Sequence, residues 1–361
     1  MIWLTLILIL PYCIMIFAIY VGLKRLEYFE SGESSSKFVS VIIPCCNEHE
    51  NLTNILNDLA FQSYPKEFFE VIIIDDNSGD DTFNVASSFS LIQNLRVIKN
   101  QGYGKKAAIG AGIAVSKSDL ILTTDADCRI GSEWLNTVVS FIETKKADLV
   151  VCPVALIPKK GFWGRFCELE FLSLQGITAG SLLINNGVMC NGANLAFRKQ
   201  VWLDNQKNLH PEIASGDDVF LLHSIKKDKK LTAAWLESRK ALGTTKSESS
   251  VNKFIKQRSR WISKASAYND RFTIALGIAT FIAVLLQATT LVAALFNCTF
   301  IYMYIAVTLL KSVPDYFILN NATKRYGRQS LILWFIPSQI IYPFYVLATA
   351  ISAVVVSFKK N

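Results

Sequence analysis

The chain has 361 residues, enough for one large domain or two small ones, and 18 % of them are charged. A mean hydropathy of +0.32 is high for a purely soluble protein, and the apolar residues are concentrated at the two ends. The net charge of +8 does not favour nucleic acid as a partner, because the basic residues cluster near predicted membrane boundaries, where anionic lipid headgroups or a diphosphate are the expected ligands. The eight cysteines lack paired spacing, which favours reduced thiols over a disulfide framework.

The first predicted element is a transmembrane anchor over residues 1–24. Ile2 to Leu23 is an uninterrupted apolar run, long enough to cross a hydrocarbon core of roughly 30 Å. A cleaved signal peptide is the alternative, but it usually begins with a basic residue, and here Lys24 and Arg25 follow the run instead. This basic pair favours a cytoplasmic middle region with the N-terminus outside.

Residues 38–248 are predicted to form one domain in which short β-branched runs alternate with helical runs. The expected strands are 39–43, closed by Pro44, and then 71–74, 95–98, 120–123 and 149–151. This alternation predicts an α/β fold, a mostly parallel sheet wrapped by helices, with ligands at the carboxyl ends of the strands. Polar residues follow three of these strands, namely Asn47 and Glu48, then Asp76, then Asp125 and Asp127.

The triplet Asp125-Ala126-Asp127 is a candidate metal site. Two carboxylates one residue apart on a turn after a strand can share Mg²⁺ or Mn²⁺ together with a diphosphate. The alternative is that both carboxylates belong to the start of the next helix, where acidic residues are common.

Other polar residues offer sites for a nucleotide. Asp76 is a candidate to accept hydrogen bonds from uracil or ribose, although Asp-Asn-Ser-Gly is also strong turn chemistry. Lys105 or Lys106 opens a helix of small residues and is in position to reach a phosphate, with a solvated lysine pair as the alternative.

Asp217 and Asp218 precede an apolar helix and form the third acidic position along the chain, after Asp76 and Asp125-Ala126-Asp127. If these acidic positions serve the transfer of a sugar with inversion, one general base must take the proton of the acceptor hydroxyl. Asp218 is the candidate base, and Asp217 is the neighbour that sets its orientation. Helix capping by Asp217 is the alternative.

Residues 249–271 are predicted to form an interfacial helix that carries a Q-x-x-R-W pentapeptide. Gln257, Arg260 and Trp261 fall at i, i+3 and i+4, hence on one face of a helix. Tryptophan can stack on a sugar ring, while arginine and glutamine can contact the diphosphate or the acceptor. The alternative is an amphipathic helix whose Trp and Arg are ordinary membrane anchors. Residues 162–183 are a second segment expected to lie on the bilayer.

Residues 272–361 are predicted to form two or three transmembrane helices. The apolar runs are 273–296, 300–319 and 330–358. Lys311, Pro314 and Asp315 interrupt the second of these runs. If the anchor and the three runs all cross the membrane, Lys359 and Lys360 lie outside, against the rule that basic residues favour the cytoplasmic side. The last segment is therefore re-entrant or interfacial, or it is an exception to that rule.

The ordered set of motifs resembles the family-two inverting glycosyltransferases, in the membrane-bound branch that contains cellulose, chitin and hyaluronan synthases and ceramide glucosyltransferase. The resemblance covers about residues 40–261. The matching motifs are V-I-I-P at 41–44 with Asn47-Glu48, D-D-N-S at 75–78, Gly104-Lys105 with Gly112, Asp125-Ala126-Asp127, N-G-A-N at 191–194, Gly216-Asp217-Asp218 and the Q-x-x-R-W residues. Family members more often have Glu-Asp at the position of Asp217-Asp218, which keeps the charge.

The resemblance implies an A-type glycosyltransferase domain, Rossmann-like, with transmembrane helices on both sides. It implies that Asp218 is the base beside Asp217, and that Asp127 binds Mg²⁺ or Mn²⁺ with Asp125 close by. The implied donor-binding residues are Pro44, Asn47, Glu48, Asp76, Lys105 and Asp125. The implied contacts to the acceptor or diphosphate are Asn191, Gly192, Asn194, Gln257, Arg260 and Trp261.

The implied reaction is metal-dependent transfer of a hexosyl or N-acetylhexosaminyl group from a nucleotide-sugar, expected to be a UDP-sugar, to a lipid-linked or glycan acceptor at the cytoplasmic face of the membrane. Three or four spans make a narrow channel at best, which favours a single transfer over a processive polysaccharide synthase. A non-enzymatic transporter or scaffold subunit is the second alternative, motivated by Lys311 and Asp315 at membrane depth. A nucleotidyltransferase is a third, but it does not need the Q-x-x-R-W residues.

Overall fold

The computed structural model describes residues 2–32, 36–213 and 215–358, and the chain divides into two compact units. The α/β unit comprises residues 27–157 and 189–246, and the helical unit comprises residues 1–26, 158–188 and 247–361. The predicted domain 38–248 is therefore interrupted by 158–188, which belongs to the helical unit. Lys359 and Lys360, on which the predicted topology of the last segment depends, lie outside the described residues.

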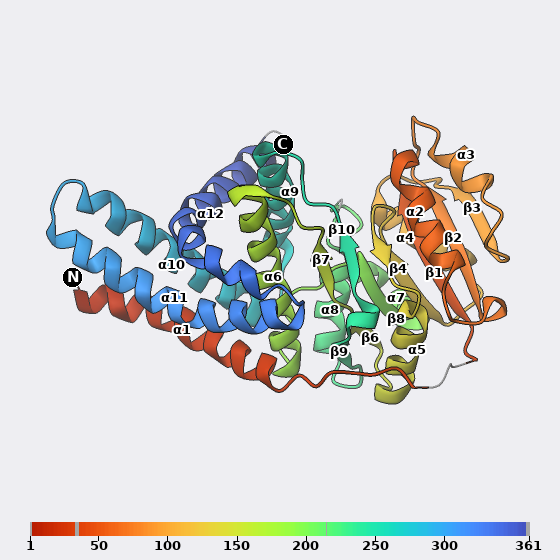
Figure 1. The fold of residues 1–361 in the computed structure, drawn as a ribbon, viewed down its shortest axis with the longest axis horizontal. Coiled ribbons are helices and arrows are strands. Elements are labelled where there is room, and N and C mark those ends of the chain that lie inside the picture. The colour runs from red at the N-terminus through yellow and green to blue at the C-terminus, as the bar shows by residue number, and fades with distance from the viewer. Residues whose placement is uncertain (1, 33–35, 214, 359–361) are drawn as a thin grey trace. The chain divides into compact units, whose positions relative to one another are not determined.

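In the α/β unit, strands alternate with helices along the first half of the chain, as predicted (Figure 1). The strands are β1 (Val39–Cys45), β2 (Phe69–Asp75), β3 (Leu95–Lys99), β4 (Leu120–Thr124), β5 (Arg129–Ile130), β6 (Leu149–Val151), β7 (Val154–Leu156), β8 (Asn194–Arg198), β9 (Ala233–Trp235) and β10 (Gly243–Thr245). The α-helices are α2 (His49–Ala60), α3 (Thr82–Ser87), α4 (Lys105–Val115), α5 (Trp134–Lys145), α7 (Lys199–Asn205) and α8 (Asp217–Lys227). Short 3₁₀ helices are η1 (Lys66–Phe68), η2 (Gln206–Leu209) and η3 (Arg239–Ala241).

Seven strands form one sheet in the order β3-β2-β1-β4-β8-β6-β9. β1 pairs in parallel with β2 and β4, and β2 pairs in parallel with β3. β8 runs antiparallel to both β4 and β6, so the sheet is mixed rather than mostly parallel. The register pairs Cys45 with Asp75, and Asp75 with Lys99, so β1, β2 and β3 end at the same edge. The residues that follow these carboxyl ends are thereby gathered at that edge.

The core of the α/β unit lies on both faces of the central strands. β1, β2 and β4 are buried along their whole length, as expected for Val- and Ile-rich strands covered on both sides. Gly112 lets α4 approach the sheet closely, because a Cβ added there would lie 2.6 Å from Cγ2 of Ile42. A second sheet, in the order β5-β10-β7, carries Thr245 at the end of β10.

The helical unit is built from long apolar helices. Its α-helices are α1 (Ile2–Lys24), α6 (Gly161–Leu183), α9 (Val251–Ser263), α10 (Arg271–Ala294), α11 (Thr299–Arg325) and α12 (Phe335–Phe358), and its 3₁₀ helices are η4 (Lys264–Ala267) and η5 (Gln329–Trp334). Figure 1 shows α1, α10 and α11 side by side, and these helices contact one another. Among the described residues, α1, α10, α11 and the segment formed by η5 and α12 are long and apolar enough to cross a membrane.

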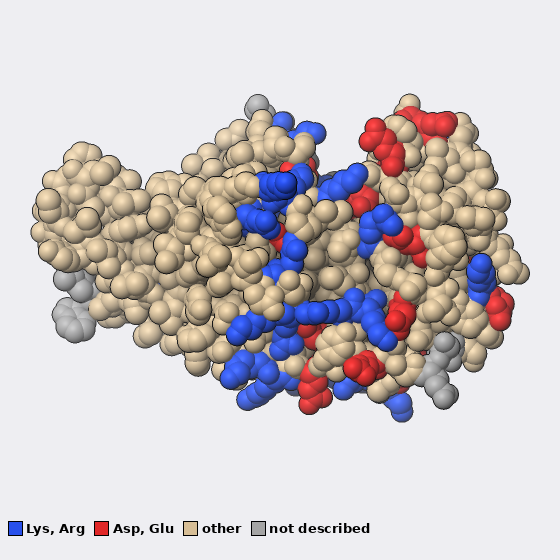
Figure 2. Space-filling model, in the orientation of Figure 1, with Lys and Arg blue, Asp and Glu red and all other residues tan. Residues whose placement is uncertain are grey.

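The surface of this unit suits a lipid environment around the connection between α10 and α11. Leu295 is 79 % exposed and Phe296 is 86 % exposed. Figure 2 shows no blue or red residues on the visible face of that end of the unit. Apolar side chains exposed to this extent without neighbouring charges mark a surface that avoids water.

The structure adds detail to two predicted helical segments. The run predicted over 300–319 continues as α11 to Arg325, and Lys311 and Asp315, which interrupt that run, lie one turn apart in α11 and pair with each other. The segment 162–183, expected to lie on the bilayer, forms α6, which packs against α1 and α11 inside the helical unit. Gly180 permits this close packing, since a Cβ added there would lie 2.2 Å from the carbonyl oxygen of Ile19.

Candidate active site

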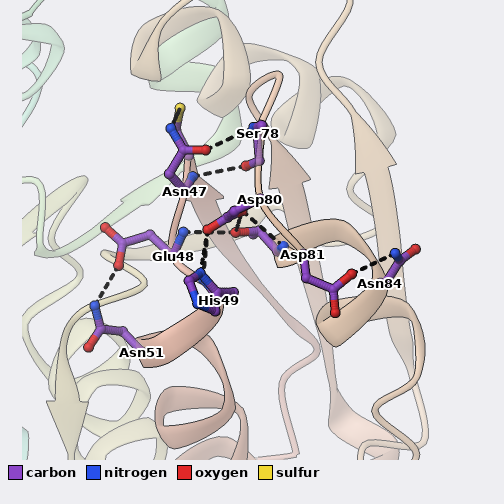
Figure 3. Close-up of polar contacts among 11 residues, drawn as sticks. Asn47, Glu48, His49, Asn51, Ser78, Asp80, Asp81 and Asn84 are labelled. Atoms are coloured by element: carbon purple, nitrogen blue, oxygen red, sulfur yellow. Dashed lines mark hydrogen bonds and ion pairs between the residues drawn. The ribbon is translucent and has the colours of Figure 1, made fainter.

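The loops after β1 and β2 are tied together by a ring of hydrogen bonds (Figure 3). Asn47 has a left-handed backbone, with φ of 57°, and its N–H donates to Oγ of Ser78 at 3.0 Å. Its side-chain oxygen accepts from the N–H of Gly79 at 2.8 Å. The N–H of Glu48 donates to Oγ1 of Thr82 at 2.8 Å. Asn47 thus holds the loop through both backbone and side chain, and the loop presents Glu48.

His49 continues this ring. Its Nδ1 lies 2.6 Å from Oδ2 of Asp80, and this hydrogen bond raises the pKa of His49. The hydrogen bond from Thr82, with a smaller contribution from His49, holds the pKa of Asp80 below its usual range. The contact of His49 with Asp80 shows that His49 joins the loop after β1 to the loop after β2.

Asp76, just beyond the end of β2, fixes the start of α4. Its carboxylate accepts from Nδ2 of Asn100 at 2.7 Å and from the N–H of Gly104 at 2.9 Å. Gly104 has φ of 86°, a left-handed conformation that favours glycine. The left-handed turn at Gly104 and the hydrogen bonds to the Asp76 carboxylate therefore both fix the start of α4, whose first residue is Lys105.

Lys105 reaches the metal-site candidate. Its Nζ forms an ion pair with Oδ1 of Asp125. Burial lowers the pKa of Lys105, but the charges of Asp125, Asp217 and Asp218 outweigh that effect and raise it. Because these charges act on one lysine, the carboxylates after β4 and those at the start of α8 lie around the same ammonium group.

Lys106 points elsewhere. Its Nζ donates to the carbonyl oxygens of His210 at 2.6 Å and Ile213 at 2.9 Å. Lys105 and Lys106 are therefore not a solvated pair. Lys106 holds the loop before α8, and the carboxylate contact belongs to Lys105.

Asp125 and Asp127 form the acidic centre of the site. Burial raises the pKa of Asp127, and the neighbouring charge of Asp125 raises it further. Burial likewise raises the pKa of Glu48, with contributions from Asp127 and Asp125, so the loop after β1 faces the same carboxylates. Within the described residues, no group of three or more His, Cys, Asp or Glu side chains is arranged to hold a metal ion. A cation here would have two aspartates and would need further oxygens from a ligand.

Sequence reasoning missed Thr245. Its Oγ1 donates to Oδ2 of Asp127 at 2.8 Å, which fixes the orientation of that carboxylate. Lys246, the next residue, donates to Oδ1 of Asn51 at 2.7 Å, and Nδ2 of Asn51 donates to Oε2 of Glu48 at 2.7 Å. The end of β10 therefore supports both the carboxylate after β4 and the one after β1.

Asp218 lies at the start of α8 and is held by backbone groups. Its Oδ2 accepts from the N–H of Gly192 at 2.9 Å, and its Oδ1 accepts from the N–H of Val219 at 2.8 Å. The carbonyl oxygen of Gly192 accepts in turn from Thr123, near the end of β4. Asp217 is 6 % exposed, whereas Asp218 is only partly buried. Of the two adjacent carboxylates, Asp218 is the more accessible.

The other predicted site residues differ in how much of their side chain is available. Asn194 is 1 % exposed, and its amide accepts from Nε1 of Trp134 at 2.9 Å and donates to the carbonyl oxygens of Pro153 and Ala241. These bonds use both polar atoms of the amide, so Asn194 links the two sheets. Asn191 is partly exposed, and its Oδ1 accepts from the N–H of Ala193 at 3.0 Å. Pro44 lies inside β1, opposite Ile74.

The Q-x-x-R-W residues belong to the helical unit, in α9. Arg260 is exposed, while Gln257 and Trp261 are partly buried. Gln257 donates through Nε2 to Oε1 of Glu248 at 2.9 Å. The carboxylates described above all belong to the α/β unit, which brings together the residues after β1, β2 and β4 and the start of α8.

Comparison with known proteins shows which family this part of the chain resembles. Residues 40–204 match the model of glycosyl transferase family 2. Glycosyltransferase AglE of Haloferax volcanii is 40 % identical over 119 residues, which cover 32 % of this chain and 39 % of AglE. Undecaprenyl-phosphate 4-deoxy-4-formamido-L-arabinose transferase of Pseudomonas savastanoi is 35 % identical over 111 residues, 30 % of this chain and 33 % of that protein. Beta-monoglucosyldiacylglycerol synthase of Trichormus variabilis is 28 % identical over 151 residues, 40 % of this chain and 32 % of that protein.

The chain thus spans less than two fifths of the length of these relatives. Among solved structures, the mannosyltransferase PcManGT from Pyrobaculum calidifontis, in complex with GDP-Man and Mn²⁺, is similar in fold, with a TM-score of 0.56 and 14 % sequence identity over 90 % of this chain and 98 % of that one. The α/β fold with flanking apolar helices agrees with the predicted A-type fold. The comparisons confirm the predicted resemblance to glycosyl transferase family 2 over residues 40–204.

Proposed function

We propose that this protein is a membrane-embedded inverting glycosyltransferase that moves one sugar from a UDP-sugar to a lipid-linked acceptor. The observation that carries the proposal is that the carboxylates of Asp125, Asp127, Asp217 and Asp218 interact with the Lys105 ammonium group, while Glu48 interacts with Asp125 and Asp127. Four carboxylates beside one ammonium group are better suited to bind a cation and a diphosphate than to be packed in a protein core. The family match supports transfer of a glycosyl group.

In this proposal, the loops after β1 and β2 hold the nucleoside. Glu48 and Asp76 accept hydrogen bonds from the base and the ribose, and Asn47 and Pro44 shape the loop that carries Glu48. Lys105 contacts the diphosphate. Each of these residues follows a strand end or opens a helix, where ligands of α/β sheets usually bind.

Asp125 and Asp127 are proposed to hold Mg²⁺ or Mn²⁺. The raised pKa of Asp127 supports this assignment, because two carboxylates that repel each other are relieved by a divalent cation. Two protein oxygens with the remaining positions left for phosphate oxygens is a usual arrangement for Mg²⁺. Such a cation would neutralise charge on the leaving nucleoside diphosphate.

Asp218 is proposed to be the general base. The acceptor hydroxyl oxygen forms a bond to C1 of the sugar, the bond from C1 to the phosphate oxygen breaks, and the hydroxyl proton moves to the Asp218 carboxylate. Attack from the face opposite the leaving diphosphate inverts the configuration at C1. The backbone N–H groups of Gly192 and Val219 support this role, because they fix the carboxylate in one orientation.

The acceptor is proposed to approach through the membrane, where Gln257, Arg260 and Trp261 contact it or the diphosphate, together with Asn191 and Gly192. Two relatives have lipids in their names, undecaprenyl phosphate in one and, as the product of a synthase, monoglucosyldiacylglycerol in the other. Among the described residues, α1, α10, α11 and the segment of η5 and α12 are apolar enough to cross a membrane, which agrees with a lipid acceptor. Lys24, Arg25 and Arg328 at helix ends favour a cytoplasmic active site.

A panel of labelled UDP- and GDP-sugars, incubated with membranes that contain the full chain, tests the function. The proposal expects organic-soluble label with a UDP-sugar and none with Asp218→Asn. High-mass polymeric label would indicate a processive synthase instead. Release of pyrophosphate rather than a nucleoside diphosphate would indicate a nucleotidyltransferase, and no turnover with any donor would contradict an enzymatic function.

A further inference from the structure

Arg258 lies within the Q-x-x-R-W pentapeptide but is not one of its three named residues. It follows Gln257 directly in α9 and is only 4 % exposed. A buried arginine needs compensating partners, because an unpaired charge away from water is costly. Its partners show what it does.

Its first partner is Glu170 of α6, itself 7 % exposed. Arg258 Nε donates to Oε1 of Glu170 at 2.9 Å and Nη2 donates to Oε2 at 2.5 Å, a two-point contact. Tyr345 of α12 donates its hydroxyl to Oε1 of Glu170 at 3.0 Å. A paired contact of this kind fixes direction as well as distance. Arg258 therefore ties α9 to α6, and through Glu170 to α12.

Its second set of partners is the motif itself. Nη1 of Arg258 donates to Oε1 of Gln257 at 2.5 Å. The guanidinium carbon lies 4.1 Å from the centre of the Trp261 ring and 4.5 Å from the centre of the Phe254 ring. The guanidinium is thus in contact with two aromatic rings and with the carboxamide of Gln257. Two of the three motif side chains are in direct contact with this group.

We propose that Arg258 is a positioning residue for sugar transfer. Anchored by Glu170, its guanidinium sets the carboxamide of Gln257 and the indole ring of Trp261 for contact with the acceptor and the diphosphate. The inference rests on the proposed function, in which those two side chains contact substrate. Arg258 itself touches no substrate and acts through its neighbours.

A purely structural ion pair is the rival explanation, and one double variant separates the two. A buried ion pair can often be replaced by apolar residues of similar volume without loss of stability. Arg258→Met/Glu170→Met keeps apolar packing between α9 and α6 but removes the donor to Gln257 and the cation beside Trp261. We expect a melting temperature in detergent close to that of wild type, with kcat for transfer lowered about 10- to 100-fold, as a small misplacement of contacting groups can cause.

In this variant we expect kcat and the KM for the acceptor to change. The affinity for UDP is expected to stay unchanged, because UDP binding is assigned to the α/β unit. Lys256→Met is the matched control, because it removes one positive charge from an exposed position on the same helix and is expected to leave transfer unchanged. A double variant with wild-type transfer, or a Lys256→Met variant impaired as strongly, would overturn the inference.

A second readout does not depend on activity. The emission of Trp261, taken as the difference between the wild type and Trp261→Phe, is expected to shift in the double variant because the indole loses its neighbouring cation. An unshifted difference spectrum would overturn the inference by itself. Absence of transfer in the wild type with every donor would contradict the proposed function, while the emission shift would still decide whether Arg258 sets the ring.

Discussion

The carboxylates of the candidate site and those of the helical unit differ in how their charges are compensated. In the helical unit, the buried carboxylate of Glu170 pairs with Arg258, and the partly buried carboxylate of Asp315 pairs with Lys311, whose Nζ lies 2.6 Å from Oδ2. In the α/β unit, several carboxylates surround Lys105, and burial and repulsion raise the pKa of Asp127 and of Glu48. Paired opposite charges hold helices together, whereas carboxylates that outnumber the neighbouring cations are suited to bind a metal ion.

The largest expected effect is at Asp218. Replacing Asp218 with Asn keeps the side chain's size but removes the proposed base, so we expect kcat for sugar transfer to fall about 10²- to 10⁴-fold, with UDP affinity retained. Asp119→Asn is the matched control, since Asp119 is exposed just before β4, at the opposite edge of the same sheet. Single-turnover rates and UDP titrations of both variants measure this, and near-wild-type turnover of Asp218→Asn would refute the base assignment.

Next is the ion pair inside the helical unit. Lys311 is 1 % exposed and contacts both Asp315 and Oε1 of Gln339. Lys311→Met leaves Asp315 uncompensated, so we expect a loss of roughly 3–5 kcal/mol in the free energy of unfolding. The double variant Lys311→Met/Asp315→Leu is expected to recover most of it and to transfer sugar normally. A double variant that is stable but inactive would show that this pair serves the reaction, which would contradict the claim that it only holds helices together.

A smaller effect is expected at Thr245. Thr245→Val removes the hydroxyl that orients Asp127 while keeping the shape of the side chain. Loss of a group that supports a metal ligand typically weakens metal affinity about 10- to 100-fold. Mn²⁺ titrations of UDP binding measure the change. Thr244→Val, the neighbouring position in β10, is the control, and equal effects in the two variants would argue against a specific contact.

The smallest effect concerns pH. The pKa of Asp127 in the folded state is raised from its ordinary value of 3.8, so the folded state binds this proton more tightly than the unfolded state does. The contribution to stability is therefore present at low pH and is lost as pH rises from about 3.8 through the raised pKa. Without metal, the melting temperature of the wild type should fall as pH rises across this range. The fall should be smaller for the wild type with Mn²⁺ and smaller for Asp127→Asn. A fall of the same size in all three samples would show that Asp127 is not its source.

The sequence predicts the first half of the sheet well and the second half poorly. β1, β2 and β4 are continuous β-branched runs, and their burial depends little on distant partners. β8 (Asn194–Arg198) carries Asn and Arg at its ends, and its strand character comes from pairing with β4 and β6 on either side. β10 has only three residues. Such strands are set by tertiary pairing rather than by local propensity.

The same reasoning explains the site. Asp76, Asp125 and Asp127 are predictable, because each follows a strong strand and such residues meet at the end of a sheet. Thr245 follows a weak strand, and its contact with Asp127 spans more than a hundred residues. Glu170 and Arg258 are also far apart in sequence, with no local pattern to link them. Side chains that support others through distant contacts leave little trace in a single sequence.

The most direct test of the carboxylate site is the cation dependence of UDP binding to the full chain, measured by calorimetric titration in detergent. Our account predicts binding that requires Mn²⁺ or Mg²⁺, that is lost in Asp127→Ala and that survives in Asp218→Asn. UDP binding that is equally tight with a chelator present, or that is unchanged in Asp127→Ala, would contradict it.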